Sequence, residues 1–226
     1  MRQMNSRLSR GQAIAVLLWF PVHMFVLPYM GLFGMQRGLL SDVEANLLVY
    51  TVGALFMLLV LRRFLRRDFD PLCDRPLGFL LAVVGLFLLC RFGNFLVNVL
   101  LIVFDVAASN TNNDAVISMM KADPLPSAAM TVILAPILEE CLFRAGIFGL
   151  LRRKSRLLAY FGSALLFGAY HLVPQAFYQP QQWIFLLHYL PSSLCLAYAY
   201  EYNDSLWSSI FLHMLLNGVA LAATLS

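Results

Sequence analysis

Charged residues are scarce in this chain, and their scarcity argues against an ordinary water-soluble domain. Of the 226 residues only 12% are charged, whereas 61% are hydrophobic and the mean hydropathy is +0.75. Soluble domains usually carry about 25% charged residues. The sequence therefore predicts an integral membrane protein that is surrounded by membrane lipid and forms one bundle rather than several independent domains.

Several other signatures are also missing. The four cysteines show no CxxC spacing, which argues against a disulfide framework or a cysteine zinc site. The chain has no internal repeat, no low-complexity segment and no alternating strand pattern of the β-barrel type. Its first apolar run, 11–34, is longer than the core of a typical signal peptide and lacks a clear small-residue cleavage site, so we expect a retained helix.

What the chain does contain is a series of apolar runs, and a spanning helix needs about 20 such residues. Because backbone polar groups must be satisfied inside lipid, these runs predict an all-α, polytopic transmembrane helical bundle. We expect about seven membrane helices, or eight if the loop at 105–124 enters the membrane, and a short interfacial helix at 115–121. The expected membrane helices are 11–34, 45–61, 76–104, 125–151, 157–172, 183–200 and 205–225.

The net charge of +4 does not indicate nucleic acid binding, because the basic residues gather at the ends of the apolar runs. With the N-terminus inside, twelve of the sixteen Lys and Arg residues fall on the inner side, before the first helix and at 62–75 and 152–156. The positive-inside rule therefore predicts a multi-pass protein of the cell membrane whose N-terminus is cytoplasmic and whose C-terminus is outside.

Candidate site residues with ionisable or amide side chains lie in three of the last four apolar runs. They are Glu139, Glu140 and Arg144 in the run 125–151, His171 in 157–172, and His213 and Asn217 in 205–225. A rise of 1.5 Å per helical residue places all of them at similar depth within the membrane. Each alone would most often be a structural contact between helices, but an intramembrane cluster of ionisable residues favours a functional site.

The spacing of these residues indicates their chemistry. Glu140 and Arg144 stand four residues apart with the acid first, which favours an ion pair and leaves Glu139 for another task. A buried carboxylate beside His171 can activate a water for attack on a carbonyl group. His213 and Asn217, also four residues apart, can donate hydrogen bonds to the oxyanion that develops.

Zinc is the rival use of the same side chains. His171, His213 and Glu139 form an acceptable ligand set for a catalytic zinc ion. However, the chain has no HExxH motif, and the same three residues are what a metal-free site would need. The residues leave the question open, and our expectation is a site without a required metal or other cofactor.

Three motifs occur in a fixed order on successive predicted helices: EExxxR at 139–144, FxxxH at 167–171 and HxxxN at 213–217. Together they resemble the type II CAAX prenyl endopeptidase and bacteriocin-processing family (CPBP, Abi-like). The resemblance covers about 125–226. We therefore expect a four-helix catalytic core at 125–226 and a part with three helices and an outside loop at 1–124, joined in one bundle.

The resemblance implies an intramembrane endopeptidase. Glu139 would be the general base, assisted by His171, and His213 and Asn217 would form the oxyanion hole. Glu140, Arg144 and Phe167 would support the site. The implied substrate is a peptide or a lipidated protein, and the compact chain is more similar to bacterial members than to the eukaryotic ones that trim prenylated proteins.

Two other functions would use the same fold. A non-catalytic bacteriocin self-immunity or scaffold protein would bind a partner without needing Glu139 as a base. A small transporter would use the Glu and His residues as a proton relay, although the chain shows no inverted hydropathy repeat. On the third helix Arg91, Asn94 and Asn98 share a face, where we expect packing contacts, with binding of a peptide carboxylate as the alternative.

Overall fold

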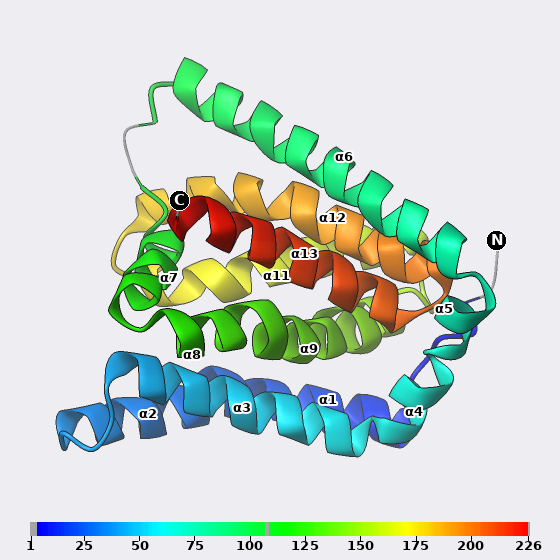
Figure 1. Ribbon diagram of the computed structural model, residues 1–226, viewed down its shortest axis with the longest axis horizontal. Coiled ribbons are helices and arrows are strands. Elements are labelled where there is room, and N and C mark those ends of the chain that lie inside the picture. Colours follow the sequence, from blue (N-terminus) through cyan, green and yellow to red (C-terminus); the bar gives the residue numbers. More distant parts are fainter. Residues whose placement is uncertain (1–3, 107–108, 226) are drawn as a thin grey trace.

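The computed structural model describes residues 4–106 and 109–225, and this part of the chain is helical with no strand (Figure 1). The expected all-α bundle is therefore confirmed. By length and composition, five helices within the described residues can cross a membrane. They are Arg10–Gln36, Asp42–Val60, Pro76–Val103, Arg156–Ala176 and Leu206–Thr224.

The N-terminal half is a hairpin followed by one long separate helix. The first arm joins α1 (Arg10–Pro21), η1 (Val22–Val26) and α2 (Leu27–Gln36), and the second is α3 (Asp42–Val60). The short helices α4 (Arg62–Arg67) and α5 (Asp70–Asp74) lead to α6 (Pro76–Val103). Figure 1 shows α6 slanting across the outside of the bundle, where its core face packs on the last two helices.

The C-terminal half holds the centre of the bundle. The helix expected at 125–151 is a central rod of five segments. They are α8 (Pro124–Ala128), η2 (Ala129–Leu134), α9 (Ala135–Glu140), η3 (Cys141–Phe148) and α10 (Gly149–Leu151). It is followed by α11 (Arg156–Ala176), η4 (Pro180–Phe185), α12 (Leu186–Asn203) and α13 (Leu206–Leu225). The rod lies between the N-terminal hairpin and α11, α12 and α13 (Figure 1).

Local signals in the sequence explain where several helices begin. Ser9 and Ser41 each form a capping box, with Gln12 and Glu44 respectively, and so satisfy backbone N–H groups that the first turn leaves free. The connection between the two hairpin arms turns at Gly38, whose φ of +67° suits a residue without a Cβ atom. These caps fix the length of the hairpin arms.

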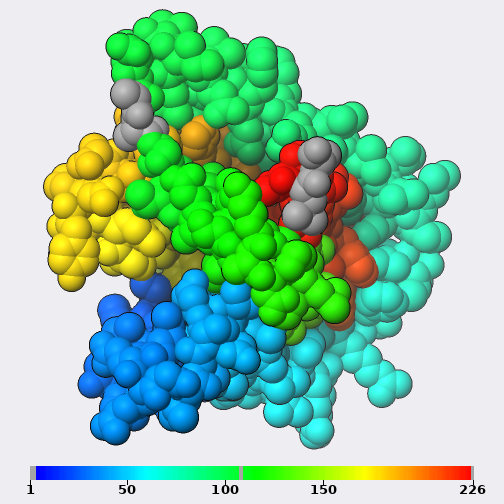
Figure 2. Space-filling view, turned by 60° about the vertical axis from the view of Figure 1, so that its left-hand side comes forward, coloured from blue at the N-terminus to red at the C-terminus, as the bar shows by residue number. Residues whose placement is uncertain are grey.

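The short helix expected at 115–121 is present as α7 (Thr111–Ala122) and begins at the N-cap Asn110. Figure 2 shows α7 lying across the end of the bundle, between the α2–α3 turn and the end of α13. Gln182 fastens the start of this helix, because its Oε1 accepts from the backbone N–H and the hydroxyl of Thr111. Helix α7 therefore covers one end of the bundle.

At the opposite end the N-terminal segment is fastened to the turn between the last two helices. Asp204, with φ of +51°, accepts hydrogen bonds from the backbone N–H groups of Asn5 and Ser6. The Tyr200 hydroxyl donates to the Ser6 carbonyl at 2.7 Å, and Arg153 donates to the Leu8 carbonyl at 3.0 Å. These bonds hold a segment without regular structure against the helical bundle.

Asp68 joins the same end to the start of α13. Its side chain is 3% exposed and accepts from the backbone N–H of Leu206, and its carbonyl accepts from the Ser205 hydroxyl at 2.7 Å. Burial raises the pKa of the Asp68 carboxyl from 3.8 to about 6. The Leu206 bond and the charge of Arg67 act in the opposite direction but do not cancel the effect of burial.

Candidate active site

The three predicted motifs meet in the middle of the bundle. Glu139 and Glu140 end α9, at the point where the helix changes from α-helical to π-helical hydrogen bonding, and Arg144 follows within η3. Such changes of helical type are frequent at functional sites. Helix α11 brings His171 and α13 brings His213 to the same place. Residues from three separate helices therefore form one polar cluster.

Glu140 forms the buried base of this cluster. Its Oε2 lies 3.1 Å from Nε of Arg144, and both side chains are fully buried, so the expected ion pair is confirmed. The same oxygen accepts from the Ser209 hydroxyl, and Oε1 accepts from Nδ1 of His213 at 2.7 Å. Glu140 is therefore occupied by these three partners and holds Arg144 and His213 in place.

Arg144 is surrounded on its other sides as well. One guanidinium nitrogen donates to the Ser193 hydroxyl at 3.0 Å, and the charged carbon lies 4.3 Å from the ring centre of Phe167. A guanidinium over an aromatic face gains a cation–π attraction, which is larger in a dry site. Phe167 also contacts His171, with ring centres 4.6 Å apart, so it packs between the ion pair and the imidazole.

Glu139 faces both histidines through one oxygen. Its Oε2 lies 3.7 Å from Nε2 of His171 and 3.9 Å from Nε2 of His213. Nδ1 of His171 lies 2.9 Å from the Phe167 carbonyl and must donate to it, and Nδ1 of His213 donates to Glu140. In their neutral forms both imidazoles therefore present an unprotonated Nε2 toward Glu139.

Exposure distinguishes the members of this group. Glu139 is 2% exposed, whereas the His171 side chain is 15% exposed. The His171 ring stacks on Tyr189 at 4.8 Å, and the Tyr189 hydroxyl accepts from Nδ2 of Asn112 at 3.1 Å. The accessible edge of the cluster thus lies at His171, and Tyr189 connects it to the start of α7.

Asn217 lies one turn beyond His213 but has a different neighbour. Its Nδ2 donates to the Thr131 carbonyl at 2.8 Å, in the π-helical segment η2. An amide NH₂ group has two N–H donors, so this bond orients the side chain and leaves a second donor. The spacing HxxxN therefore places the two residues on one side of α13, with only His213 in contact with the glutamates.

Other polar residues around the cluster carried no signal in the sequence. Ser193 and Ser209 stand in apolar helices as ordinary small residues, and only the fold shows that they bind Arg144 and Glu140. His23, for which the sequence indicates no partner, lies 2.9 Å from the Tyr170 hydroxyl, which in turn lies 3.4 Å from the hydroxyl of Tyr50. The N-terminal hairpin thus contributes polar groups beside the site.

The polar face of α6 does not reach the glutamates through any bond in the described residues. Asn94 donates to the Ser192 hydroxyl at 3.3 Å, and Asn98 lies 2.7 Å from Nε2 of His188. These contacts tie α6 to α12, as expected for packing residues. Arg91 is exposed on the same helix.

Within the part of the chain that the structure describes, no group of three or more His, Cys, Asp or Glu side chains has the arrangement of a metal site. Two Nε2 atoms and one carboxylate oxygen do converge at Glu139, as a zinc ligand set would require. Tetrahedral ligands at about 2.1 Å from zinc would be roughly 3.4 Å apart, so each Nε2 atom would have to approach Oε2 of Glu139 by a few tenths of an ångström.

Comparisons with known proteins bear on the same region. Residues 121–219, somewhat less than half of the chain, match the family described as Type II CAAX prenyl endopeptidase Rce1-like. The chain is also 28% identical over 142 residues to the "Putative membrane peptidase YdiL" of Bacillus subtilis (strain 168). That alignment covers 62% of this chain and 54% of the relative, so the chain spans about half of the relative's length.

No solved structure matches the chain. The matched residues 121–219 include all three motifs that the sequence analysis singled out, with Asn217 near the end of the match. The expected resemblance to the CPBP proteases is therefore confirmed.

Proposed function

We propose that this chain, whose residues 121–219 are similar to the type II CAAX prenyl endopeptidases, is a membrane endopeptidase that uses Glu139 to activate water. The observation that carries the proposal is the division of labour between adjacent carboxylates. Glu140 is fully engaged by Arg144, His213 and Ser209, whereas Glu139 directs one oxygen at two imidazole nitrogens.

A water molecule fits the chemistry of this arrangement. The separations of 3.7 and 3.9 Å are too long for direct hydrogen bonds, and two acceptors face each other when Glu139 is ionised and His171 is neutral. A water supplies the two protons that such acceptors need. Bound to Oε2 of Glu139 and Nε2 of His171, it would direct its oxygen lone pairs at a substrate carbonyl.

The proposed reaction then proceeds in two steps. The water oxygen attacks the carbonyl carbon while Glu139 takes a proton from it, which produces a tetrahedral intermediate with a negative oxygen. Glu139 next gives this proton to the leaving amine nitrogen as the carbon–nitrogen bond breaks. The products are a carboxylic acid and an amine, so the atoms of one water are added across the peptide bond.

Stabilisation of the negative oxygen falls to His213 and Asn217 in this proposal. Since Nδ1 of His213 donates to Glu140, its Nε2 can donate only when the ring is a doubly protonated imidazolium. The neighbouring Glu140 carboxylate supports that cation. Asn217 contributes the N–H that it does not give to Thr131. Two such donors stabilise the intermediate more strongly than water would.

The substrate that we propose is a peptide or a lipidated protein in or at the membrane. Access has to occur at the His171 edge, because Glu139 and Glu140 are enclosed. The chain is proposed to act without a bound metal. If zinc is required instead, His171, His213 and Glu139 would hold it, and the ion would supply Lewis-acid activation of the same water.

The deciding experiment compares peptide cleavage by the purified full chain in detergent with cleavage by Glu139→Gln, which keeps size and hydrogen bonding but removes the base. The panel contains farnesylated CAAX peptides and double-glycine leader peptides. Glu44→Gln is the matched control, because Glu44 is exposed in a capping box that Gln also satisfies. We expect wild type and control to cleave, and Glu139→Gln to lose at least a hundredfold in rate.

Other outcomes would contradict parts of the proposal. Normal turnover by Glu139→Gln would refute the mechanism. Loss of wild-type cleavage with a zinc chelator, and its return with added zinc, would replace the metal-free site by the zinc alternative. Absence of cleavage across the whole panel, with all variants folded, would favour a non-catalytic binding protein of the same fold.

A further inference from the structure

A second polar site lies at the end of the bundle that the basic residues predict to be cytoplasmic. It is a cavity of about 830 Å³ between the N-terminal segment with the start of α1, the end of α3, and α4. This volume is within the range of small-molecule binding sites. The residues that line it are Arg7, Leu8, Ser9, Gln12, Leu59, Val60, Arg62, Arg63, Phe64 and Arg67.

The cavity is strongly basic. Four of its lining residues are arginines, and of the described residues that line it none is acidic. Arg62 and Arg63 are exposed, and no ion pair joins either of them to a carboxylate among the residues that the structure describes. Like charges this close repel one another, so a bound anion would stabilise the cluster.

Three acidic residues near this end are engaged elsewhere, and the exposed Asp70 and Asp74 of α5 do not line the cavity. Asp204 accepts from the backbone of Asn5 and Ser6, and Asp68 caps the start of α13. Glu201 is paired with Arg152 and Arg156. No carboxylate of the described residues lines the cavity, so a ligand from outside the chain can supply the matching negative charge.

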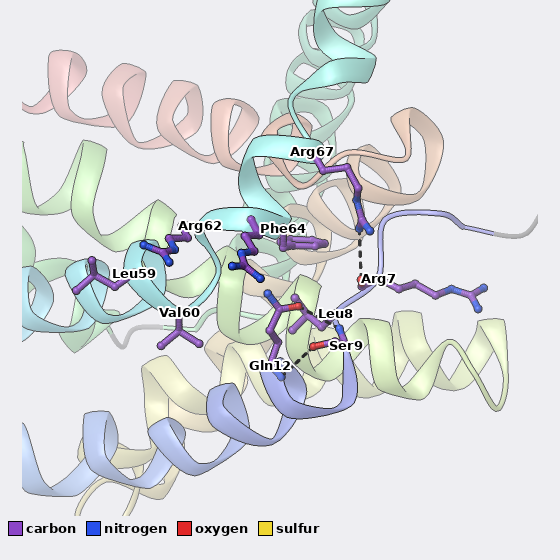
Figure 3. A pocket seen from close by; sticks show the side chains of 10 residues that line it. Arg7, Leu8, Ser9, Gln12, Leu59, Val60, Arg62, Phe64 and Arg67 are labelled. Atoms are coloured by element: carbon purple, nitrogen blue, oxygen red, sulfur yellow. Dashed lines mark hydrogen bonds between the residues drawn. The ribbon is translucent and has the colours of Figure 1, made fainter.

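The other half of the cavity wall is apolar. Leu8 and Phe64 are buried, and Leu59, 69% exposed, continues the lipid-facing surface of α3. Figure 3 shows Leu59 and Val60 on one side, and Arg67 reaching from α4 to the carbonyl of Arg7 on the other. A free inorganic anion would make no use of the apolar side.

The depth of the cavity in the membrane also favours an amphiphilic ligand over a free anion. Helix α3, one of the segments that can span the membrane, ends at Val60, and the arginines of α4 follow directly. The end of a spanning helix lies where hydrocarbon gives way to headgroups, and arginines on the cytoplasmic side attract anionic lipids there. An amphiphile at this level would lay its acyl chains along α3 and its phosphate among the guanidinium groups.

We propose that this cavity binds the phosphate-bearing headgroup of an anionic phospholipid. Arginine suits this task because its planar guanidinium can donate two parallel hydrogen bonds to a phosphate. The ligand contacts the N-terminal segment and α4 together, so it joins parts of the chain that otherwise meet through few bonds, such as the one from Arg67 to Arg7. This site is separate from the proposed catalytic cluster and does not depend on peptidase activity.

The test measures lipid binding and thermal unfolding of the purified full chain in detergent micelles. The probes are dioleoyl phosphatidylglycerol, dioleoyl phosphatidylcholine, glycerol 3-phosphate and inorganic phosphate. The cavity variant is Arg62→Gln with Arg63→Gln. The control is Arg75→Gln with Lys154→Gln, which removes two charges from exposed residues at the same end, outside the cavity. Unfolding without lipid verifies that both variants fold.

We expect wild type and control to bind phosphatidylglycerol at least tenfold more tightly than phosphatidylcholine and to melt at a higher temperature in its presence. The cavity variant should lose roughly tenfold or more in affinity relative to the control, because two guanidinium groups that donate to the phosphate are removed. If the cavity variant and the control lose the same affinity for phosphatidylglycerol, general attraction between basic residues and anionic lipid explains the binding, and the proposed site is overturned. Equal binding of glycerol 3-phosphate or phosphate would overturn the lipid assignment, as would the absence of any preference by wild type.

Discussion

Replacing Glu140 by Gln is expected to destabilise the protein strongly, although the two side chains have nearly the same shape. The substitution removes the negative charge opposite Arg144, whose side chain is fully buried. The Ser193 hydroxyl and the Phe167 face remain beside the guanidinium, but neither carries a charge. Breaking a buried ion pair by removing one partner typically costs about 3–5 kcal/mol, because a charge is left uncompensated.

The magnitude can be measured by thermal unfolding in detergent. For a chain of this length each kcal/mol corresponds to about 2–4 °C, so Glu140→Gln should lower the melting temperature by roughly 6–20 °C. Glu201→Gln is the matched control. Its carboxylate, 11% exposed, is paired with Arg152, 10% exposed, and with Arg156, 51% exposed, at the end of the bundle. Because water reaches the Arg156 side of this cluster, its loss should cost less than that of the fully buried pair, about 1–2 kcal/mol.

A double variant separates the ion pair from other effects of the substitution. Glu140→Gln with Arg144→Met removes both charges, and such replacements are often close to neutral. The double variant should therefore recover most of the stability that the single variant loses. If Glu140→Gln unfolds within about 1 kcal/mol of wild type, or if the double variant is no more stable than the single one, the buried charge pair is not what makes Glu140 necessary.

Two further predictions concern the ends and the packing of the bundle. Because the pKa of Asp68 is raised to about 6 in the folded protein, the folded state keeps a proton that the unfolded state releases near pH 3.8. Stability should therefore fall by up to about 3 kcal/mol as pH rises from about 4 to 6, and thermal unfolding of Asp68→Asn should lack this component; identical pH profiles would refute the assignment. Gly168→Val should cost about 1–3 kcal/mol, because its Cβ atom would overlap Leu186 and lie 3.2 Å from Cβ of Tyr189. Gly85→Val, in open space on α6, is the control, and an equal loss there would show that helix propensity rather than packing is responsible.

The sequence was sufficient to predict most of the long helices and the residues that lie together at the candidate site. Long apolar runs predict the five helices of membrane length in the described residues to within a few residues, whereas the run at 125–151 is divided into shorter segments. The expected pairing of Glu140 with Arg144 is present because i, i+4 neighbours share a helix face. Metal dependence, substrate and the catalytic roles stay predictions that the proposed experiments address, and the cytoplasmic orientation of the N-terminus stays a prediction from the distribution of Lys and Arg.

The sequence could not predict the π-helical segments or the partners of several site residues, because these depend on how the helices rotate and pack against one another. The π-helical segments η2 and η3 change which side chains share a face, and their residues have no distinctive composition. Ser209 becomes a partner of Glu140 only through the packing of α13 on the central rod. The same packing turns Asn217 toward Thr131, although its spacing from His213 suggests a common ligand.

The bonds between Asp204 and the backbone of Asn5 and Ser6 have a consequence for the order of assembly. The two ends of these contacts are separated by 198 or 199 positions in the chain. Synthesis proceeds from the N-terminus, and the helices enter the membrane in the same direction. The segment at 4–9 must therefore wait at the membrane surface until the turn at Asp204 has been made. The contacts that fasten this segment, which forms one wall of the arginine cavity, are therefore completed only after all residues that line the cavity have been synthesised.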